Sequence, residues 1–168
     1  GDISDYFAIL ANSQEGLKFV LLDKDSEGLE INQTSSLDQT RPMCEINMKD
    51  IKISEDKIMI DSDSCIDSWE KVKNISLGYL AMEQVGGAQA CLDMSTQYAK
   101  ERIQFGRPIG SFQAIQHIIA NMLLQLESAK SVAYSAVRTD TSDDLEVEMS
   151  AMLAKSYCSE VFNKIAGD

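Results

Sequence analysis

The spacing of apolar residues changes near residue 65, and this change limits the chain to a fold that contains both helices and strands. Before it, short apolar or alternating segments are separated by turn residues about every ten positions, a pattern typical of antiparallel strands. After it, apolar residues recur every three or four positions, which indicates amphipathic helices. The sequence therefore predicts an α+β fold, with a partial antiparallel β domain followed by an up-down helical bundle.

The segments that we expect to form strands all lie in the first 60 residues. They are Tyr6–Ala11, Leu17–Leu22, Leu29–Asn32, Met43–Met48 and Ile51–Ile53. The intervening segments Asn12–Gly16 and Asp23–Gly28 are rich in residues that favour tight turns. A sheet of this size buries little surface when it is alone, so we expect it to be marginally stable by itself.

The rest of the chain predicts three long helices. The first extends from about Asp67 to Glu101 and is followed by Phe105–Gly110, where two glycines and a proline fall within five residues and break the helix. Ser111 is expected to cap the second helix, because its hydroxyl can accept a hydrogen bond from a backbone N–H group. The apolar stripe of the second helix is Ile115, Ile119, Met122, Leu126, Ala129, Ala133 and Ala136.

The third helix is expected to begin after Thr141, which forms a pattern similar to a capping box with Asp144. Its apolar residues are Leu145, Met149, Met152, Leu153, Val161 and Ile165. The pattern is still periodic at Asp168, so we expect the parent protein to continue. Three helices leave one face of a bundle open, and we expect further sequence or another chain to cover it.

The charge balance argues against binding to nucleic acids or to anionic membrane surfaces. Asp and Glu total 27 against 15 Lys and Arg, which gives a formal charge of −12, whereas both of those activities need a surplus of cations. No stretch of about 18 uncharged apolar residues occurs, so we expect no membrane span.

The four cysteines show no CxxC spacing, and the single histidine, His117, lies far from them along the chain. A zinc site needs about four clustered ligands, so no metal site is expected. Scattered cysteines in a chain without a signal-peptide pattern are typical of reduced thiols, and we therefore expect a cytoplasmic protein.

A cluster of basic residues stands out in this acidic chain. No Lys or Arg occurs from residue 74 to 99, and then Lys100, Arg102 and Arg107 follow within eight positions. One interpretation is that these cations only complement the dipole at the end of a helix. The alternative is a phosphate site, with arginine forks and the N-terminus of the next helix as donors. In that case Phe105 and Phe112 would offer their faces to a planar ring.

Gly86 and Gly87 lie inside the first expected helix, where each glycine costs roughly 1 kcal/mol relative to alanine. They indicate either a close approach of two helices or room for a ligand. Glu83 lies one turn before Gly87, on the same side as Leu80 and Ser76. It is expected either to face that room or to be solvated or ion-paired.

The segment from Tyr98 to His117, YAKERIQFGRPIGSFQAIQH, strongly resembles the acyl-CoA dehydrogenase family. Val85–Asp93 fits the helix that precedes this motif, and Gly16–Asp23 with Gly28-Leu29 resembles the later strands of the family's central β domain. The resemblance implies that residues 1–60 are the C-terminal part of that β domain. It implies that residues 61–168 are a truncated C-terminal helical domain.

The resemblance also implies FAD as the cofactor, held across a dimer interface. Arg102 would bind the flavin pyrophosphate. The residues that would line the ADP part are Gln104, Phe105, Phe112 and Gln113. Ser76, Leu80 and Glu83 are the candidates for contact with an acyl-CoA substrate.

One departure from the family pattern concerns the substrate. Many members have an acidic residue followed three positions later by an arginine that helps to hold the acyl-CoA, and here Asn74 and Leu77 stand at those positions. A minority place the catalytic glutamate on this helix, where this chain has Ser76. We therefore name no catalytic residue in this chain.

The resemblance makes the chain a fragment of a flavin-dependent acyl-CoA dehydrogenase, which removes hydrogen across the α and β carbons of an acyl thioester. Its partners would be an acyl-CoA, a homodimer, tetramer or mixed oligomer, and an electron-transfer acceptor. The alternatives are a non-catalytic structural subunit of a mixed oligomer and a helical oligomerisation module. The fragment itself is expected to be inactive.

Overall fold

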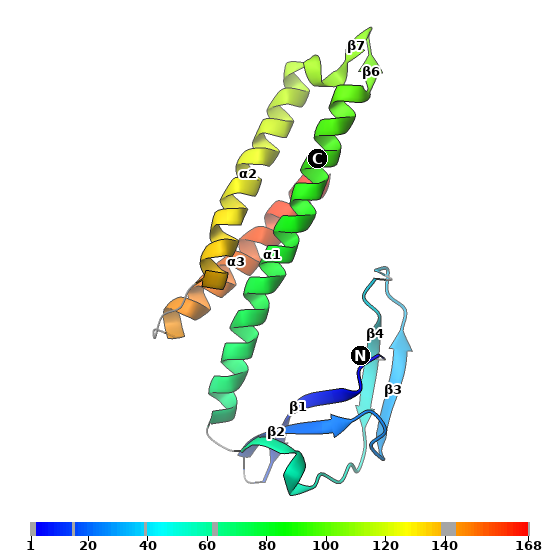
Figure 1. Ribbon diagram of the computed structural model, residues 1–168, viewed down its shortest axis with the longest axis vertical. Coiled ribbons are helices and arrows are strands. Elements are labelled where there is room, and N and C mark those ends of the chain that lie inside the picture. Colours follow the sequence, from blue (N-terminus) through cyan, green and yellow to red (C-terminus); the bar gives the residue numbers. More distant parts are fainter. Residues whose placement is uncertain (1–2, 15, 39, 62–63, 139–143, 168) are drawn as a thin grey trace. The chain divides into compact units, whose positions relative to one another are not determined.

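The computed structural model describes residues 3–14, 16–38, 40–61, 64–138 and 144–167. These residues form two compact units, Gly1–Glu70 and Lys71–Asp168. Antiparallel sheets build the first unit, and three helices build the second (Figure 1). The expected α+β fold is thus confirmed. Among the helices that the structure describes, none combines the length and the apolar content needed to cross a bilayer.

The first unit contains a three-stranded antiparallel sheet in the order β1-β2-β5. The strands are β1 (Tyr6–Ser13), β2 (Gly16–Asp23) and β5 (Ile58–Asp61). Strands β1 and β2 pair along their whole length, from Tyr6 opposite Asp23 to Ser13 opposite Gly16. The buried apolar side chains of the unit are Phe7, Val20, Leu22 and Cys65.

Strands β3 (Leu29–Thr34) and β4 (Met43–Met48) form a separate two-stranded antiparallel pair. The expected strand Ile51–Ile53 is wrong, because the chain has no regular structure there. It turns at Asp50, whose φ of 52° is left-handed, and this turn takes the following residues out of the β3–β4 ladder. A short 3-10 helix, η1 (Glu55–Lys57), then leads into β5.

The second unit is built from α1 (Ser64–Glu101), whose first residues belong to the other unit, α2 (Gln113–Arg138) and α3 (Asp144–Gly167). Side chains from all three helices form one buried cluster. Gln84 of α1 donates a hydrogen bond to Ser159 of α3 at 2.9 Å. Cys158 of α3 donates to the carbonyl oxygen of Ala129 in α2 at 3.5 Å.

The predicted stripe of α2 is confirmed from Ile119 to Ala136, whereas Ile115 at its start is half-buried and lies outside the buried cluster. Met122, Leu126, Ala129 and Ala133 are fully buried, while Ile119 and Ala136 are partly buried against the same cluster. These residues recur every three or four positions, so they fall on one side of the helix.

The expected apolar face of α3 is wrong in its first half. Its large apolar side chains there are exposed, namely those of Leu145, Met149, Met152 and Leu153. The buried residues are instead Ala151, Ala154 and Cys158, followed by the expected Val161 and Ile165. Small residues allow the backbone of α3 to approach its neighbours closely, and the larger residues then project outward.

Two further expectations concern helix ends. Ser111 does not cap α2, because its hydroxyl donates a hydrogen bond to the carbonyl oxygen of Pro108 at 2.7 Å. The helix begins after Phe112, whose carbonyl oxygen accepts hydrogen bonds from the N–H groups of Ile115 and Gln116, each at 3.1 Å. The expected cap at Thr141 lies outside the described residues.

Candidate functional site

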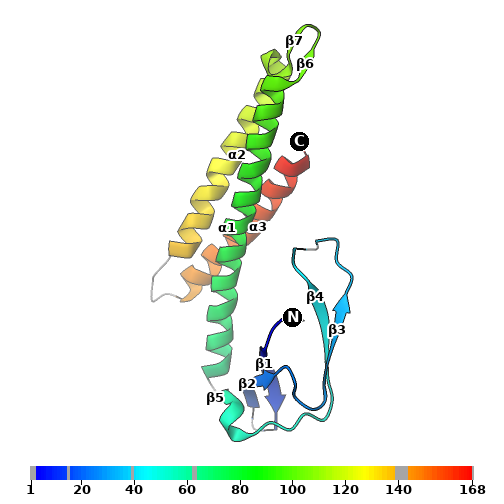
Figure 2. The same ribbon diagram turned by 45° about the vertical axis from the view of Figure 1, so that its right-hand side comes forward.

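A β-hairpin joins α1 to α2 (Figure 2). Of the basic cluster, Arg107 lies in the hairpin and Arg102 directly before it, whereas Lys100 lies in the last turn of α1. The hairpin strands are β6 (Ile103–Gln104) and β7 (Arg107–Pro108), with Gln104 paired with Arg107. The two residues at the tip, Phe105 and Gly106, have φ values of 53° and 78°. Two successive left-handed residues are the signature of a type I′ turn, which suits a two-residue hairpin.

Backbone hydrogen bonds fix the base of this hairpin. The N–H group of Arg102 donates to the carbonyl oxygen of Tyr98, and the N–H group of Ile109 donates to the carbonyl oxygen of Arg102, both at 2.8 Å. Gly110 lies so close to α1 that an added Cβ would be 3.0 Å from the carbonyl oxygen of Ala99. The side-chain amide of Gln116 donates to the carbonyl oxygen of Gly110 at 2.9 Å. These hydrogen bonds and the close approach of Gly110 to α1 define the conformation of the loop.

The aromatic side chains of the hairpin lie together. The ring centroids of Phe105 and Phe112 are 6.1 Å apart, and the rings are nearly perpendicular at 86°. The guanidinium carbon of Arg107 lies 4.1 Å from the centroid of Phe112, well within cation–π range. Phe105 is 90% exposed, so its ring is accessible from solvent.

The predicted cofactor residues are therefore brought into one region, the exposed loop between two helices. Arg102, Gln104 and Phe105 are exposed on the hairpin, and Gln113 is the exposed first residue of α2. The first backbone N–H groups of α2 have no acceptor within the helix. Cations, aromatic rings and a helix N-terminus thus occur within about a dozen residues, an arrangement that can bind an anionic group attached to a planar ring.

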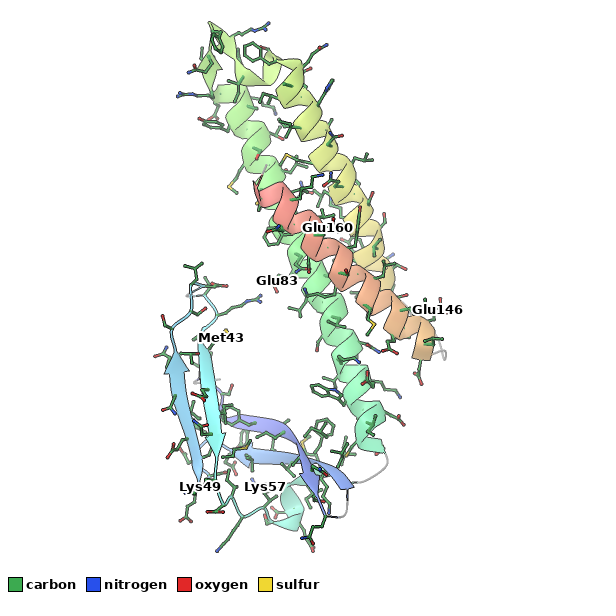
Figure 3. The ribbon with its side chains drawn as sticks, turned by 180° about the vertical axis from the view of Figure 1, so that it is seen from behind. Met43, Lys49, Lys57, Glu83, Glu146 and Glu160 are labelled. Atoms are coloured by element: carbon green, nitrogen blue, oxygen red, sulfur yellow. The ribbon has the colours of Figure 1, made fainter. Side chains whose placement is uncertain are left out.

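The residues predicted to contact an acyl-CoA do not lie near the hairpin. Ser76, Leu80 and Glu83 are exposed on α1 and recur every three or four positions, which places them along one side of the helix. Figure 3 labels Glu83 on α1. Glu83 is about 25–30 Å along the helix axis from the hairpin, given a rise of 1.5 Å per residue. The hydroxyl of Ser76 donates a hydrogen bond to the carbonyl oxygen of Val72 at 2.7 Å. The structure does not bring this set together with the hairpin.

The two positions that depart from the family pattern differ in their surroundings. Asn74 is only 8% exposed, and its side-chain oxygen is buried without a hydrogen-bond partner. Leu77 is half-buried. Neither side chain carries a charge, so neither can form an ionic contact with a phosphate or a carboxylate.

Gly86 and Gly87 of α1 have different surroundings. An added Cβ at Gly87 would lie 2.7 Å from the ring of Phe162 in α3, whereas an added Cβ at Gly86 would meet nothing within 4 Å. The close approach of two helices therefore accounts for Gly87. The space beside it is filled by Phe162 and is not a ligand pocket.

Within the described ranges, no three His, Cys, Asp or Glu side chains gather closely enough to hold a metal ion. All four cysteines are free thiols. These findings leave the hairpin as the part of the described chain with the strongest concentration of binding chemistry.

Sequence reasoning included Arg107 in the basic cluster but did not assign it to the site. Its contact with Phe112 depends on the hairpin, which brings two residues five positions apart into a stack. No periodic pattern predicts such a contact. The only signal was the presence of an arginine between two phenylalanines in a loop.

Comparison with known proteins gives a family match. Residues 77–168 match the model of the acyl-CoA dehydrogenase C-terminal domain. Acyl-CoA dehydrogenase IpdE2 of Mycolicibacterium smegmatis is 39% identical over 89 residues, which are 53% of this chain and 27% of that protein. The short/branched chain specific acyl-CoA dehydrogenase of Rattus norvegicus mitochondria is 30% identical over 169 residues, covering 94% of this chain and 38% of that protein.

Solved structures show the same fold. Butyryl-CoA dehydrogenase from Megasphaera elsdenii superposes with a TM-score of 0.89 at 21% identity, over 98% of this chain and 45% of that one. An FAD complex of PigA superposes with a TM-score of 0.82 at 27% identity, over 99% of this chain and 45% of that one. The chain spans less than half the length of each of these relatives.

Proposed function

The chain belongs to the acyl-CoA dehydrogenase family, and from that premise we propose that it is part of a flavin-dependent acyl-CoA dehydrogenase. Its contribution is a binding surface for the ADP part of FAD, formed by the hairpin and the start of α2. The single observation that supports this role is the grouping of Arg102, Phe105 and Phe112 beside the N-terminus of α2.

The residues present fit such a group. A guanidinium can donate two hydrogen bonds to a diphosphate, and Arg102 is exposed where it can do so. The N-terminus of α2 adds backbone donors and a partial positive charge. Phe105 supplies an accessible aromatic surface for adenine, and Gln104 and Gln113 supply polar side chains at its edges.

When bound, FAD would supply the hydride acceptor for dehydrogenation of an acyl thioester. This chain's residues bind and orient the nucleotide end of the cofactor. The turn of α1 with Asn74, Ser76 and Leu77 holds no carboxylate that could remove the α proton. We therefore assign no catalytic base in this chain, and we expect that the 168-residue chain alone does not oxidise an acyl-CoA.

The other partners follow from the same premise. The substrate is an acyl-CoA, for which Ser76, Leu80 and Glu83 are the candidate contacts. A second subunit completes the cofactor site in a homodimer, a tetramer or a mixed oligomer, and an electron-transfer acceptor reoxidises the flavin. Four free thiols support a reducing compartment such as the cytoplasm.

A second candidate function is a structural subunit of a mixed oligomer that does not itself catalyse dehydrogenation. It is favoured by the uncharged Asn74 and Leu77, because an acidic residue and an arginine stand at these positions in many members of the family. The two candidates differ in turnover. Oxidation of an acyl-CoA by the intact protein without another subunit supports the enzyme, whereas FAD binding without turnover supports the structural subunit.

The binding role is tested by titrating the intact apoprotein with FAD. Arg102→Ala removes a charged bidentate contact worth about 1.5–3 kcal/mol and should weaken FAD affinity by roughly 10- to 150-fold. Arg102→Lys should recover only part of this loss, because an ammonium keeps the charge but not the fork. Wild-type affinity in Arg102→Ala would leave helix-end stabilisation as the role of Arg102.

A further inference from the structure

Arg107 and the two aromatic residues of the hairpin form a continuous stack. The guanidinium carbon of Arg107 lies 4.1 Å from the centroid of Phe112. Phe112 in turn lies edge-to-face with Phe105, with centroids 6.1 Å apart. The three residues come from β7, from the position before α2 and from the hairpin tip. The stack therefore links the hairpin to the start of α2.

This stack limits how a planar ligand can bind. The guanidinium covers one face of Phe112, so a ring that stacked on that face would have to displace Arg107. Phe105 is 90% exposed and retains accessible surface. The geometry thus favours contact of the ligand ring with Phe105, while Phe112 acts as its support.

We propose that Arg107 is a positioning residue, which holds Phe112 edge-to-face with Phe105 so that Phe105 is ready to contact the adenine ring of FAD. The cation–π attraction between guanidinium and ring restrains the side chain of Phe112 before any ligand arrives. Less ordering is then needed on binding, and a site ordered in advance binds more tightly. This inference rests on the proposed ADP-binding role of the hairpin.

The competing role for Arg107 is that of a second cation for the diphosphate. The two roles differ in what part of the ligand they depend on. A positioning residue that acts through Phe112 affects only ligands with a ring, whereas a phosphate-binding cation affects every ligand with a diphosphate. ADP and inorganic pyrophosphate separate these cases, because both carry a diphosphate and only ADP carries a ring.

The experiment measures the affinity of the intact apoprotein for FAD, ADP and pyrophosphate by calorimetry. The variants are Arg107→Ala, Arg107→Lys and Arg102→Ala. Arg138→Ala is the matched control, because Arg138 lies over the ring of Tyr134 at 5.6 Å in the same unit, at the other end of α2. The melting temperature of each apoprotein is also recorded, because a general loss of folded protein would weaken the binding of all three ligands together.

Arg107→Ala should weaken ADP and FAD binding by about two- to fivefold, the range expected for an exposed cation–π contact, and leave pyrophosphate affinity unchanged. Arg107→Lys should lie between wild type and Arg107→Ala. Arg102→Ala should weaken the binding of all three ligands, and Arg138→Ala should weaken the binding of none of them.

The inference is overturned if Arg107→Ala weakens the binding of pyrophosphate and of ADP by the same factor, which is the result expected for a phosphate-binding cation. It is also overturned if ADP affinity does not change. If the wild-type protein binds none of the three ligands, the proposed function itself fails. If the wild type binds them and only the Arg107 pattern is absent, the proposed function stands without this inference.

Discussion

Phe105 combines two unfavourable features in a single residue. Its backbone is left-handed, with φ of 53°, a conformation that is uncommon for bulky residues. Its side chain is also 90% exposed. Asparagine followed by glycine is the preferred pair for a type I′ turn, so folding alone does not require a phenylalanine here. Strain of this kind is concentrated at functional sites.

Phe105→Asn should therefore separate stability from binding. The melting temperature should stay the same or rise, because asparagine tolerates the left-handed conformation. FAD affinity should fall by roughly 5- to 150-fold if a base–aromatic contact of about 1–3 kcal/mol is lost. Unchanged FAD affinity together with a lower melting temperature would show that the ring serves the fold and not the ligand.

Gly86 and Gly87 provide a matched pair within one helix. Both substitutions to alanine gain the same helix propensity, but only the new Cβ at position 87 would meet the ring of Phe162, at 2.7 Å. Gly87→Ala should therefore be less stable than Gly86→Ala by about 1–3 kcal/mol, the usual cost of overpacking. Urea unfolding of both variants measures this difference, and equal stabilities would contradict the close packing of α1 and α3.

At the scale of the elements, the long helices were the most predictable part of the fold. The stripe from Ile119 to Ala136 has apolar residues at regular spacing, and the buried face of α2 follows from it. In α3 the same reasoning failed, because hydrophobicity alone favours Met149 and Leu153 over the small residues that in fact pack inside. Which face a helix buries depends on how closely its neighbours approach, and spacing does not encode that distance.

The strands show a similar limit. Ile51-Lys52-Ile53 alternates as well as any true strand in the chain, yet it has no pairing partner among the described strands. Alternation predicts that a segment can be extended, whereas a sheet also needs an available edge. The glycines and proline of Phe105–Gly110 predict a break between two helices. They do not predict that the side chains of Arg107, Phe112 and Phe105 contact one another.

The packing of α3 on α2 can be tested through its buried cysteine. Cys158 is 1% exposed, and burial raises the pKa of its thiol, an effect that nearby Lys155 partly offsets. A raised pKa leaves less of the reactive thiolate at any given pH below it. In the folded chain at pH 8, alkylation should therefore reach the half-buried Cys44 and Cys91 well before Cys158.

Mass spectrometry of the alkylated peptides gives the order of reaction. Equal rates at all three positions in a chain that retains its helical circular dichroism would mean that α3 is not packed as described. Alkylation in urea is the control, because all the thiols should then react alike.

For the whole molecule, exposed apolar surface is the feature most in need of an explanation. The sequence predicts an open bundle face that further sequence or another chain covers. The apolar stripe of α2 does not form that face, because most of its residues are buried within the helical unit. The exposed apolar side chains of α3 lie outside it, at Leu145, Met149, Met152 and Leu153. A cluster of such residues on one helix is more typical of an interface than of a free surface.

The chain should therefore self-associate at high concentration, through this exposed part of α3. Sedimentation velocity should show oligomers for the wild type and a shift toward monomer for the double variant Met149→Lys and Leu153→Lys, because a charge at a buried contact is unfavourable. Leu124→Lys, which changes a residue of similar exposure on α2, is the control. A well-folded wild-type monomer at high concentration would contradict this expectation.

The central claim is that the hairpin and the start of α2 bind the ADP part of FAD. The most direct test is an amide NMR titration of the isotope-labelled intact apoprotein with ADP, followed by the same titration of Arg102→Ala. In the wild type, ADP should shift the amide signals of residues 102–116 selectively, and Arg102→Ala should remove most of these shifts at the same ADP concentration. Shifts confined to other parts of the chain, or equal shifts in the variant, would contradict the account.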